Sequence, residues 1–334
     1  MARISIFGSG NWGLTLAHLA EQSGSQVMLW ARRDEVAQAL RTARRHPVFL
    51  PHLRLGAQVA VSTDLNEVAT FSRHWVVAVP SQHVRAWARA VAPQVVPGLQ
   101  VLSASKGLEV STRLRLSQVM HKEWQWAASM PAVGAISGPN LAAEVSRGEP
   151  AAAVVVADPV GFQGWVERLG RAHLRLYRQA DLVGVELGGA LKNVLVIAVG
   201  MADGLGLGDS TKAALITRGL HEMGRLATTL GANWSTLAGL SGLGDLVATA
   251  ASPHSRNRQC GQALAQGMSM AEILGQTPMV IEGVPTAHAA FALGRHYQLT
   301  MPITEQVVAI LGGKPVADAL PELMARALVD ETAL

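Results

Sequence analysis

A single lysine interrupts the most apolar stretch of this 334-residue chain, residues 182–202. Gly188 and Gly189 lie about one turn before Lys192, although each glycine costs a helix interior roughly 1 kcal/mol relative to alanine. That cost suggests that another group approaches closely, and Gly188, on the same face as Lys192, leaves open space beside the amine. Burial moves a lysine pKa toward neutrality, which suits a general acid or base. We prefer this interpretation to that of a structural lysine whose head reaches solvent.

Two further charged groups are candidates for the same chemistry. Lys106 follows a predicted strand at its carboxyl end, the edge at which open α/β sheets bind ligands. It is suited to bind an anion or polarise a carbonyl, and a solvated loop lysine is an equal alternative. Asp245, after a glycine turn, has an apolar setting. A buried carboxylate needs a cation or hydroxyl donors, so we expect Lys192 or substrate hydroxyls beside it, unless it only caps a helix.

The run Ser255-Arg256-Asn257-Arg258 packs hydroxyl, guanidinium and amide groups into one turn. Such a set suits a phosphate, because arginine binds its oxygens in a bidentate manner. Without context, an ordinary polar loop is the better explanation of the run. The histidines show no metal-ligand spacing, and the sequence has no Cys/His cluster or nucleophile elbow. We therefore expect no metal in the chemistry.

The chain opens with an apolar run, a glycine turn and a helix-like segment. The turn Gly8-Ser9-Gly10-Asn11-Trp12-Gly13 has the spacing G-x-G-x-x-G. Gly8 permits a tight turn, Gly10 lets backbone approach a pyrophosphate, and Gly13 lets the helix lie close to the strand. The helix N-terminus presents N–H groups to the phosphates. A second apolar run at 27–30 completes a βαβ unit, so we favour a dinucleotide site over an ordinary glycine turn.

Cofactor choice depends on the residues after the second predicted strand. NAD sites usually place Asp or Glu there for the ribose hydroxyls, while arginines suit the extra phosphate of NADP. This chain has Arg32 and Arg33, with Asp34 just beyond. We expect NADPH or NADH, with NADPH favoured, although solvent-facing arginines at a strand end are an equal alternative. The arginines of the next predicted helix are expected to form a solvated face: Arg41, Arg44 and Arg45.

Strand and helix signals alternate along the first 180 residues. They predict an α/β fold with a Rossmann-type, doubly wound parallel sheet and helices on both of its faces. Further strands are expected at 58–62, 75–79, 100–104, 133–136, 151–157 and 174–177. Helical patterns then dominate, at 182–202, 211–230, 235–250, 258–265, 286–295 and 304–311. We expect a dinucleotide-binding domain at 1–180 and an all-helical substrate domain at 181–334.

Composition excludes several classes of protein. Hydrophobic residues make up 49% and charged residues 16%, which excludes a disordered chain and leaves apolar surface for a homodimer. The net charge of +4 is modest and the basic residues are dispersed, so we expect an anionic small molecule and no nucleic acid. The single cysteine, Cys260, and a start on a strand favour the cytoplasm. Because Glu186 and Lys192 interrupt the apolar stretch, we expect no membrane insertion.

The chain resembles the bacterial NAD(P)-dependent glycerol-3-phosphate dehydrogenases from its first strand to at least residues 301–303. Many motifs, in the same order as in that family, carry the resemblance. They are Ser105-Lys106-Gly107-Leu108-Glu109, Ile136-Ser137-Gly138-Pro139, Gly188-Gly189-Ala190-Leu191-Lys192-Asn193, Lys212-Ala213-Ala214-Leu215-Ile216-Thr217-Arg218-Gly219-Leu220, Gly242-Leu243-Gly244-Asp245-Leu246, Ser255-Arg256-Asn257-Arg258 and Val280-Ile281-Glu282-Gly283.

This resemblance implies reversible reduction of dihydroxyacetone phosphate to sn-glycerol 3-phosphate, the backbone precursor of phospholipids. Hydride would pass from C4 of the nicotinamide to the ketone carbon, with Lys192 as proton donor and acceptor and with Lys106 and Asp245 in the same catalytic cluster. These three would also bind the substrate, together with Gly138, Asn140, Ser255, Arg256 and Asn257. The cofactor would contact Gly8, Gly10, Asn11, Trp12, Gly13, Arg32, Arg33, Lys106, Ala142, Arg256, Val280 and Glu282.

Three positions depart from the pattern of the family. Asn140 stands where Ser or Thr is usual, His46 where Asn commonly precedes the Phe-Leu-Pro turn, and Ser210 where Asn is frequent. All three remain hydrogen-bonding residues, and none removes the proposed acid or the phosphate anchor. Two other functions stay open at this point. One is a related dehydrogenase acting on another phosphorylated ketone or an oxo-acid, and the other is a dinucleotide-sensing module without turnover.

Overall fold

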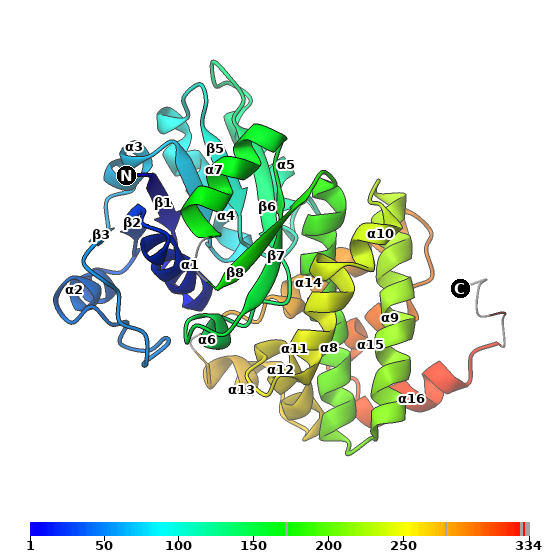
Figure 1. Cartoon of the computed structure of the whole chain (residues 1–334). Coiled ribbons are helices and arrows are strands. Elements are labelled where there is room, and N and C mark those ends of the chain that lie inside the picture. Colours follow the sequence, from blue (N-terminus) through cyan, green and yellow to red (C-terminus); the bar gives the residue numbers. More distant parts are fainter. Residues whose placement is uncertain (171–172, 278, 328–329, 331–334) are drawn as a thin grey trace. The chain divides into compact units, whose positions relative to one another are not determined.

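The computed structural model describes residues 1–170, 173–277, 279–327 and 330. By their contacts the residues form two compact units (Figure 1). Unit 1 consists of Met1–Ser105 and Leu116–Leu182, and unit 2 of Lys106–Arg115 and Val183–Leu334. The ranges expected from the sequence are continuous, whereas ten residues that follow Ser105 belong with unit 2. Residues 171–172 of the expected first domain, and residues 278, 328–329 and 331–334 of the expected second domain, lie outside the described residues.

Unit 1 is built on one sheet of eight strands, in the order β3-β2-β1-β4-β5-β6-β7-β8. Neighbouring strands run parallel as far as β6, β7 is antiparallel to β6, and β8 is parallel to β7. The α/β class is therefore confirmed, but the expected parallel pairing is wrong between β6 and β7. A parallel pair is usually joined by a crossover helix that packs along the sheet, whereas the connection between these two strands holds only the four-residue helix α6. The strands are β1 Arg3–Phe7, β2 Gln26–Trp30, β3 Val59–Ser62, β4 His74–Val77, β5 Gln100–Ser103, β6 Ala132–Ser137, β7 Ala151–Val156 and β8 Leu174–Gln179.

The strand order of unit 1 reverses between β1 and β4, since β1 pairs with β2 on one side and with β4 on the other. Ligands of doubly wound sheets bind at the carboxyl ends of the strands at such a switch point. Buried residues of β1 and α1, among them Ile6 and Leu14, pack in the core of this unit. The helices are α1 Asn11–Gln22, α2 Asp34–Thr42, α3 Leu65–Phe71, α4 Val84–Val91, α5 Leu116–Trp124, α6 Ala142–Val145 and α7 Pro159–Leu169, with 3-10 turns at Ser81–His83 and Ala92–Gln94.

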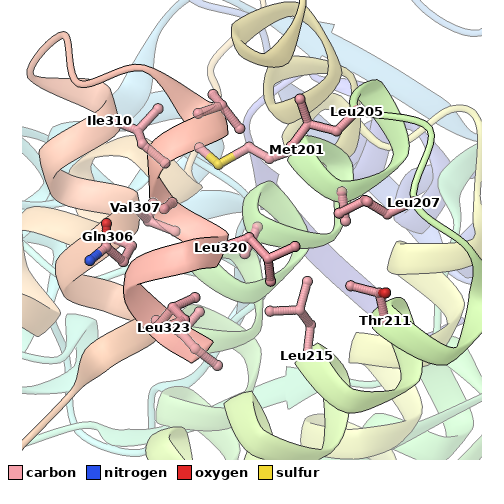
Figure 2. A pocket seen from close by; sticks show the side chains of 15 residues that line it. Met201, Leu205, Leu207, Thr211, Leu215, Gln306, Val307, Ile310, Leu320 and Leu323 are labelled. Atoms are coloured by element: carbon pink, nitrogen blue, oxygen red, sulfur yellow. The ribbon is translucent and has the colours of Figure 1, made fainter. Parts of the chain in front are cut away.

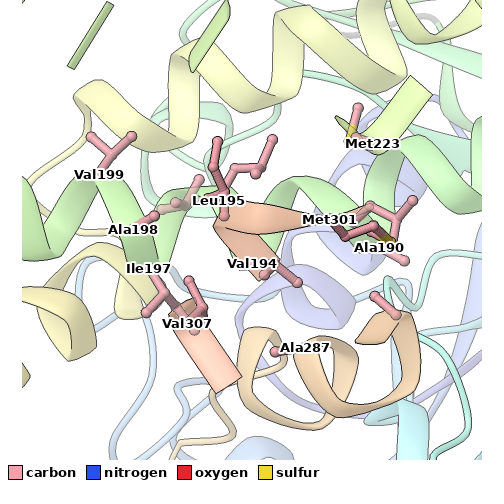
Figure 3. Packing of buried hydrophobic residues seen from close by; sticks show 14 of the residues in the cluster. Ala190, Val194, Leu195, Ile197, Ala198, Val199, Met223, Ala287, Met301 and Val307 are labelled. Carbon is pink, nitrogen blue, oxygen red and sulfur yellow. The ribbon is translucent and has the colours of Figure 1, made fainter. Parts of the chain in front are cut away.

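Unit 2 is helical and is organised around α8, Leu182–Gly204. Figure 3 shows α8 side chains such as Val194 and Ile197 among those of other helices, including Met223 and Ala287. In the described part of the chain, α8 is the one helix long and apolar enough to cross a membrane. However, 83% of the residues in its apolar stretch are buried inside the protein. It is a core helix. The other helices are α9 Asp209–Thr229, α10 Trp234–Leu237, α11 Asp245–Ala251, α12 Arg256–Ala265, α13 Met270–Gly275, α14 Gly283–His296, α15 Pro302–Leu311 and α16 Val316–Met324.

The helical prediction for unit 2 holds, with differences in detail. The single helix expected at 235–250 is divided into α10, a π-helical turn η3 at Leu240–Gly244, and α11. Sequence analysis did not identify α13 and α16. An apolar pocket opens between α8, α9, α15 and α16 (Figure 2). Met201, Leu215 and Leu320 line it, and its polar lining side chains are Thr211 and Gln306.

Candidate active site

The glycine turn of unit 1 has the geometry of a dinucleotide-binding loop. Gly8 has φ +117°, and a Cβ atom there would lie 2.5 Å from the carbonyl oxygen of Ala78. A Cβ at Gly13 would lie 1.9 Å from the carbonyl oxygen of Gly8, whereas a Cβ at Gly10 would meet nothing within 4 Å. The first turn of α1 also has no side-chain cap. Open space beside uncapped N–H groups fits a pyrophosphate.

Several buried polar side-chain atoms in unit 1 have no hydrogen-bond partner. Asn11 Oδ1 and Trp12 Nε1 lie at the start of α1, and Ser103 Oγ and Ser137 Oγ lie at the carboxyl ends of β5 and β6. Buried polar groups are rarely left without a partner in folded proteins. Their position at the carboxyl ends of the strands marks this edge of the sheet as a ligand-binding edge.

The turn after β6 is fixed to β7 by Asn140. The side-chain Nδ2 of Asn140 donates to the carbonyl oxygen of Ala152 at 2.8 Å, while its Oδ1 is buried without a partner. Gly138 has φ +151°, and a Cβ there would lie 2.7 Å from the same Ala152 oxygen. Thr15 Oγ1 donates to the carbonyl oxygen of Ala142 at 3.2 Å, which ties α6 to α1. The Nδ2 group of Asn140 therefore has a structural role, while its Oδ1 can accept a hydrogen bond from a ligand.

The two arginines after β2 are exposed. Arg33 Nε lies 3.5 Å from Glu35 Oε1, and both side chains remain more than half exposed. A surface pair of this kind contributes little to stability. Both guanidinium groups are therefore able to turn toward an anion at the end of β2.

The arginines expected on a solvated face also bind backbone carbonyl oxygens. Arg41 Nε donates to the carbonyl oxygen of Val61 at 2.9 Å, and Arg44 Nη2 to that of Val59 at 2.8 Å. Arg45 Nη1 donates to the carbonyl oxygen of Pro51 at 2.5 Å. Arg41 and Arg45 are exposed, as expected of a solvated face, while Arg44 is partly buried. Their guanidinium groups also satisfy backbone carbonyl oxygens of β3 and of the connection before it.

His46 shapes the same connection. Its Nδ1 accepts hydrogen bonds from the backbone N–H groups of Val48 and Phe49, at 3.0 and 2.9 Å. Its ring stacks on that of Phe49 with 4.5 Å between centroids. Burial, helped by the nearby Arg33 charge, lowers the pKa of His46 to about 4. The ring is therefore a neutral acceptor at physiological pH, a role also open to asparagine.

Unit 2 contains a buried cluster of two lysines, one aspartate and one threonine. Lys192 Nζ on α8 lies 2.9 Å from Asp245 Oδ1, and Lys106 Nζ lies 2.5 Å from Asp245 Oδ2. Lys192 Nζ also donates to Thr249 Oγ1 at 2.6 Å, and that hydroxyl donates to the backbone oxygen of Asp245. Lys192 is 5% exposed and Asp245 2%. Each carboxylate oxygen thus binds one ammonium group.

The local fold explains why Asp245 meets Lys192. A Cβ at Gly188 would lie 2.9 Å from the carbonyl oxygen of Ser241 and 3.3 Å from Gly242 Cα. The expectation of open space beside Gly188 is therefore wrong, because the backbone of η3 packs there. The π-helical turn η3 leads directly into α11, whose first residue is Asp245. Thr249, four residues on, lies on the same face of α11.

The charges of the cluster shift its pKa values in opposite directions. Burial lowers the pKa of Lys192 to about 8, against the Asp245 charge that raises it, and the Lys106 and Arg256 charges lower it further. Burial alone would raise the pKa of Asp245, but the Lys106 and Lys192 charges outweigh burial and lower it. At neutral pH the cluster holds an ionised carboxylate and a lysine close to its titration point, which is the property of a general acid and base.

The polar run at the start of α12 is divided between two tasks. Ser255 caps the helix by accepting from the N–H of Arg258. Arg256 Nη1 donates to the carbonyl oxygen of Val280 at 2.7 Å, and its charge acts on Lys192. Arg258 Nε instead lies 2.5 Å from Asp203 Oδ2. Of the two arginines, Arg256 is thus the one whose charge acts on the lysine cluster, while Arg258 is paired with Asp203.

Asn257 joins three helices of unit 2. Its Nδ2 donates to Asn193 Oδ1 on α8 at 2.8 Å, and its Oδ1 accepts from the N–H of Gly283 on α14 at 3.0 Å. Glu282 precedes that helix, and its carbonyl oxygen accepts from Thr286 Oγ1. These contacts hold Arg256, Val280 and Glu282 close to α8.

Two family models match the N-terminal and the C-terminal part of the chain. Residues 3–161 match the N-terminal family model of NAD-dependent glycerol-3-phosphate dehydrogenase, and residues 181–321 match the C-terminal one. The chain belongs to the NAD-dependent glycerol-3-phosphate dehydrogenase family. A Salinibacter ruber glycerol-3-phosphate dehydrogenase [NAD(P)+] is 43% identical over 100% of this chain and 96% of its own. A Geobacter sulfurreducens relative is 43% identical over 98% of each chain. The solved structure of the Coxiella burnetii glycerol-3-phosphate dehydrogenase has TM-score 0.92 and 33% identity, and the match covers 97% of this chain and 99% of that one.

Membership of the glycerol-3-phosphate dehydrogenase family confirms the resemblance seen in the sequence and the class of enzyme, an NAD(P)-dependent oxidoreductase. Within unit 1 the structure gathers the glycine turn, Gly138, Asn140 and Ala142 near the carboxyl ends of strands. Within unit 2 it gathers Lys106, Lys192, Asp245 and the start of α12. No group of three His, Cys, Asp or Glu side chains suited to a metal occurs among the described residues.

Two polar residues of this candidate site were not predicted from the sequence. Thr249 binds Lys192, and Asn193 binds Asn257. The role of Thr249 could have been predicted, because a spacing of four residues places its side chain on the same helix face as that of Asp245. The pairing of Asn193 with Asn257 had no local signal, since the residues are 64 positions apart.

Proposed function

We propose that this chain interconverts dihydroxyacetone phosphate and sn-glycerol 3-phosphate with NADPH or NADH, and so supplies the glycerol phosphate backbone for phospholipids. The observation that carries this proposal is the buried contact of Lys192 with Asp245 and Thr249. This contact places the titratable amine of Lys192 against the carboxylate of Asp245, which is the arrangement that a general acid needs in a dehydrogenase of this family. We also propose that the protein acts in the cytoplasm. Because unit 2 is rich in apolar residues, we further propose that the protein forms a homodimer.

Unit 1 is proposed to hold the cofactor. The pyrophosphate of the cofactor would lie on Gly8, Gly10, Asn11, Trp12 and Gly13, with further contacts from Arg32, Arg33 and Ala142. The family resemblance implies further cofactor contacts from residues of unit 2: Lys106, Arg256, Val280 and Glu282. When bound, the nicotinamide supplies hydride to the ketone carbon or removes it from the alcohol. The open space beside Gly10 and the uncapped first turn of α1 support the pyrophosphate position.

Lys192 is proposed to give a proton to the substrate oxygen during reduction and to take it back during oxidation. Asp245 stays ionised beside it and keeps the ammonium form of Lys192 accessible near pH 8. Lys106, bound to the other oxygen of Asp245, adds a second positive charge beside the substrate. Charge that develops on the oxygen is thereby neutralised.

The phosphate of the substrate is proposed to bind Arg256, with Ser255, Asn257, Gly138 and Asn140 completing the substrate contacts. Arginine binds phosphate oxygens in a bidentate manner. The binding energy of this remote group orients the ketone toward the reacting groups. Asn257 contributes mainly by its position, because its Oδ1 and one N–H already serve Gly283 and Asn193.

The two directions of the reaction should depend on pH in opposite ways. Ketone reduction needs protonated Lys192, so kcat for reduction should fall as pH rises through about 8. Alcohol oxidation needs the neutral amine, so kcat for oxidation should rise over the same interval. Initial rates from pH 6 to 10 at saturating substrate measure both limbs. If kcat changed with pH in the same direction for reduction and for oxidation, the assignment of Lys192 as proton donor and acceptor would be contradicted.

Arg32 and Arg33 are expected to select NADPH. Replacing both by alanine should raise KM for NADPH by at least about 10-fold and leave KM for NADH nearly unchanged, since one charge-assisted contact to phosphate contributes about 1.5–3 kcal/mol. Steady-state kinetics with each cofactor measure the ratio. Arg147→Ala, whose guanidinium pairs with Glu149 on the surface, is the control. Equal effects on the two cofactors would mean that the arginines only face solvent.

A substrate panel tests the proposed substrate. Reduction of dihydroxyacetone phosphate should exceed that of unphosphorylated dihydroxyacetone and of a simple 2-oxo acid by orders of magnitude in kcat/KM. Arg256→Lys should lose most of this preference, because lysine cannot bind the phosphate in a bidentate manner. Comparable rates on the oxo acid would favour a related dehydrogenase of different substrate class.

A further inference from the structure

Residues 106–115 form a closed loop that belongs to unit 2. Leu108 and Arg115 pair as an isolated antiparallel bridge. Between them, the N–H of Glu109 donates to the carbonyl oxygen of Leu114, and the N–H of Arg113 to that of Glu109. Leu108 is 1% exposed and packs in the core of unit 2. The loop that starts with Lys106 is therefore a defined structure with its own turn.

An ion pair fastens the end of this loop to α8. Arg115 Nη1 lies 2.5 Å from Glu186 Oε2, and the two side chains are 16% and 6% exposed. Because Arg115 is bridged to Leu108, the ion pair acts on the arm of the loop that carries Lys106, two residues before Leu108. Glu186 precedes Lys192 by six residues on α8, about 9 Å along the axis at 1.5 Å per residue.

Helix α8 therefore carries both Lys192 and the anchor of the loop that presents the second lysine. We propose that the Arg115–Glu186 ion pair is a positioning device: it holds the loop 106–115 on α8 so that Lys106 stays on Asp245 beside Lys192. Neither Arg115 nor Glu186 is a candidate for contact with the reacting atoms. They act through Lys106.

The physical basis is the freedom of the lysine side chain. Four rotatable bonds separate the ammonium group from the backbone, and ordering them opposes the contact with Asp245. A backbone fixed close to Asp245 reduces that entropic cost, whereas a loose loop adds its own freedom to it. Arg115 is suited to the task, since its planar guanidinium forms oriented contacts with a carboxylate.

Release of Lys106 has an electrostatic consequence at Lys192. The charged groups that act on Lys192 are Asp245 from α11, Lys106 from the loop and Arg256 from α12. Of these, Lys106 and Arg256 lower the pKa of Lys192, and Asp245 raises it. Moving the Lys106 charge away should therefore raise the pKa of Lys192.

Amine labelling tests the position of Lys106 without any assay of activity. The chain has only five lysines, Lys106, Lys122, Lys192, Lys212 and Lys314, so mass spectrometry can follow acetylation of each. In Arg115→Ala, Lys106 should be acetylated several-fold faster than in the wild type, while the rates at Lys122 and Lys314 stay the same. An unchanged rate at Lys106 in folded Arg115→Ala would overturn the proposal.

Two variants keep this test decisive. Glu186→Gln preserves the shape of the carboxylate side chain and removes its charge, so it should accelerate labelling of Lys106 even where Arg115→Ala does not fold. Arg147→Ala breaks a surface ion pair with Glu149 and should leave Lys106 unchanged. Urea unfolding of each variant identifies loss of global stability, which would accelerate labelling at every lysine and count against a local role.

The second readout rests on the proposed function. In Arg115→Ala the fall of kcat for ketone reduction should move to higher pH, in the same direction as in Lys106→Met. The double variant should show no further shift beyond Lys106→Met, because both changes remove the same charge. Additive shifts would overturn the proposal. If the wild type reduces no dihydroxyacetone phosphate, the proposed function fails, while the labelling result still decides the role of the ion pair.

Discussion

Lys192→Met is expected to lower kcat for reduction of dihydroxyacetone phosphate about 10³-fold, the typical contribution of a positioned general acid. Methionine fills a similar volume and carries no proton. Because Lys192 is 5% exposed, water has little access to replace the lost donor. Binding of NADPH, measured by its fluorescence, should change little, since the glycine turn that is proposed to bind it belongs to unit 1.

The loss in Lys192→Met must be separated from general disturbance of unit 2. Lys314→Met is the matched control, because Lys314 pairs with Glu322 and has no proposed role in the reaction. That variant should keep wild-type kcat. A Lys192→Met enzyme that retains more than about a tenth of wild-type kcat would show that another group supplies the proton.

Asp245→Asn is expected to abolish most activity by a different route. Asp245 raises the pKa of Lys192 against burial, so loss of its charge should move that pKa further below 8. At pH 7 the amine would then be largely neutral and unable to donate a proton. Reduction should lose at least about 10²-fold in kcat, with its pH limb displaced to lower pH. Steady-state rates across pH 5.5–9 measure both effects.

Stability gives an independent check on the same residue. Two ammonium groups lie on Asp245, and removing one member of a buried ion pair typically costs about 3–5 kcal/mol. Asp245→Ala should therefore lower the free energy of unfolding by that order in urea titrations, whereas Asp318→Ala, an exposed residue, should not. A fully stable Asp245→Ala protein would contradict the ionised cluster.

Much of the fold was readable because its signals are local. The glycine turn and the alternation of apolar runs predict unit 1, and α8 was visible as an apolar stretch. The antiparallel pairing of β7 with β6 was not predicted, because an apolar run in a sequence does not indicate the direction in which its strand pairs. The hydrogen-bond partners of Arg41, Arg44 and Arg45 were not predicted either. Their partners are backbone carbonyls at 51–61, and no side-chain pattern reports those.

The site was readable in parts for the same reason. Lys192 stands out as a lysine in an apolar helix, and Asp245 as a carboxylate after glycines. Their meeting depends on the packing of η3 against Gly188, a contact between residues about 50 positions apart. The anchoring of Lys106 through Arg115 and Glu186 is likewise long-range, and only the folded chain reveals it.

The most direct test of the central claim is the oxidation of NADPH by the purified wild-type chain on addition of dihydroxyacetone phosphate, followed by nicotinamide absorbance with the product identified. We expect rapid turnover that forms one sn-glycerol 3-phosphate for each NADPH consumed. Binding of NADPH without any turnover would contradict it and would favour a module that senses the dinucleotide.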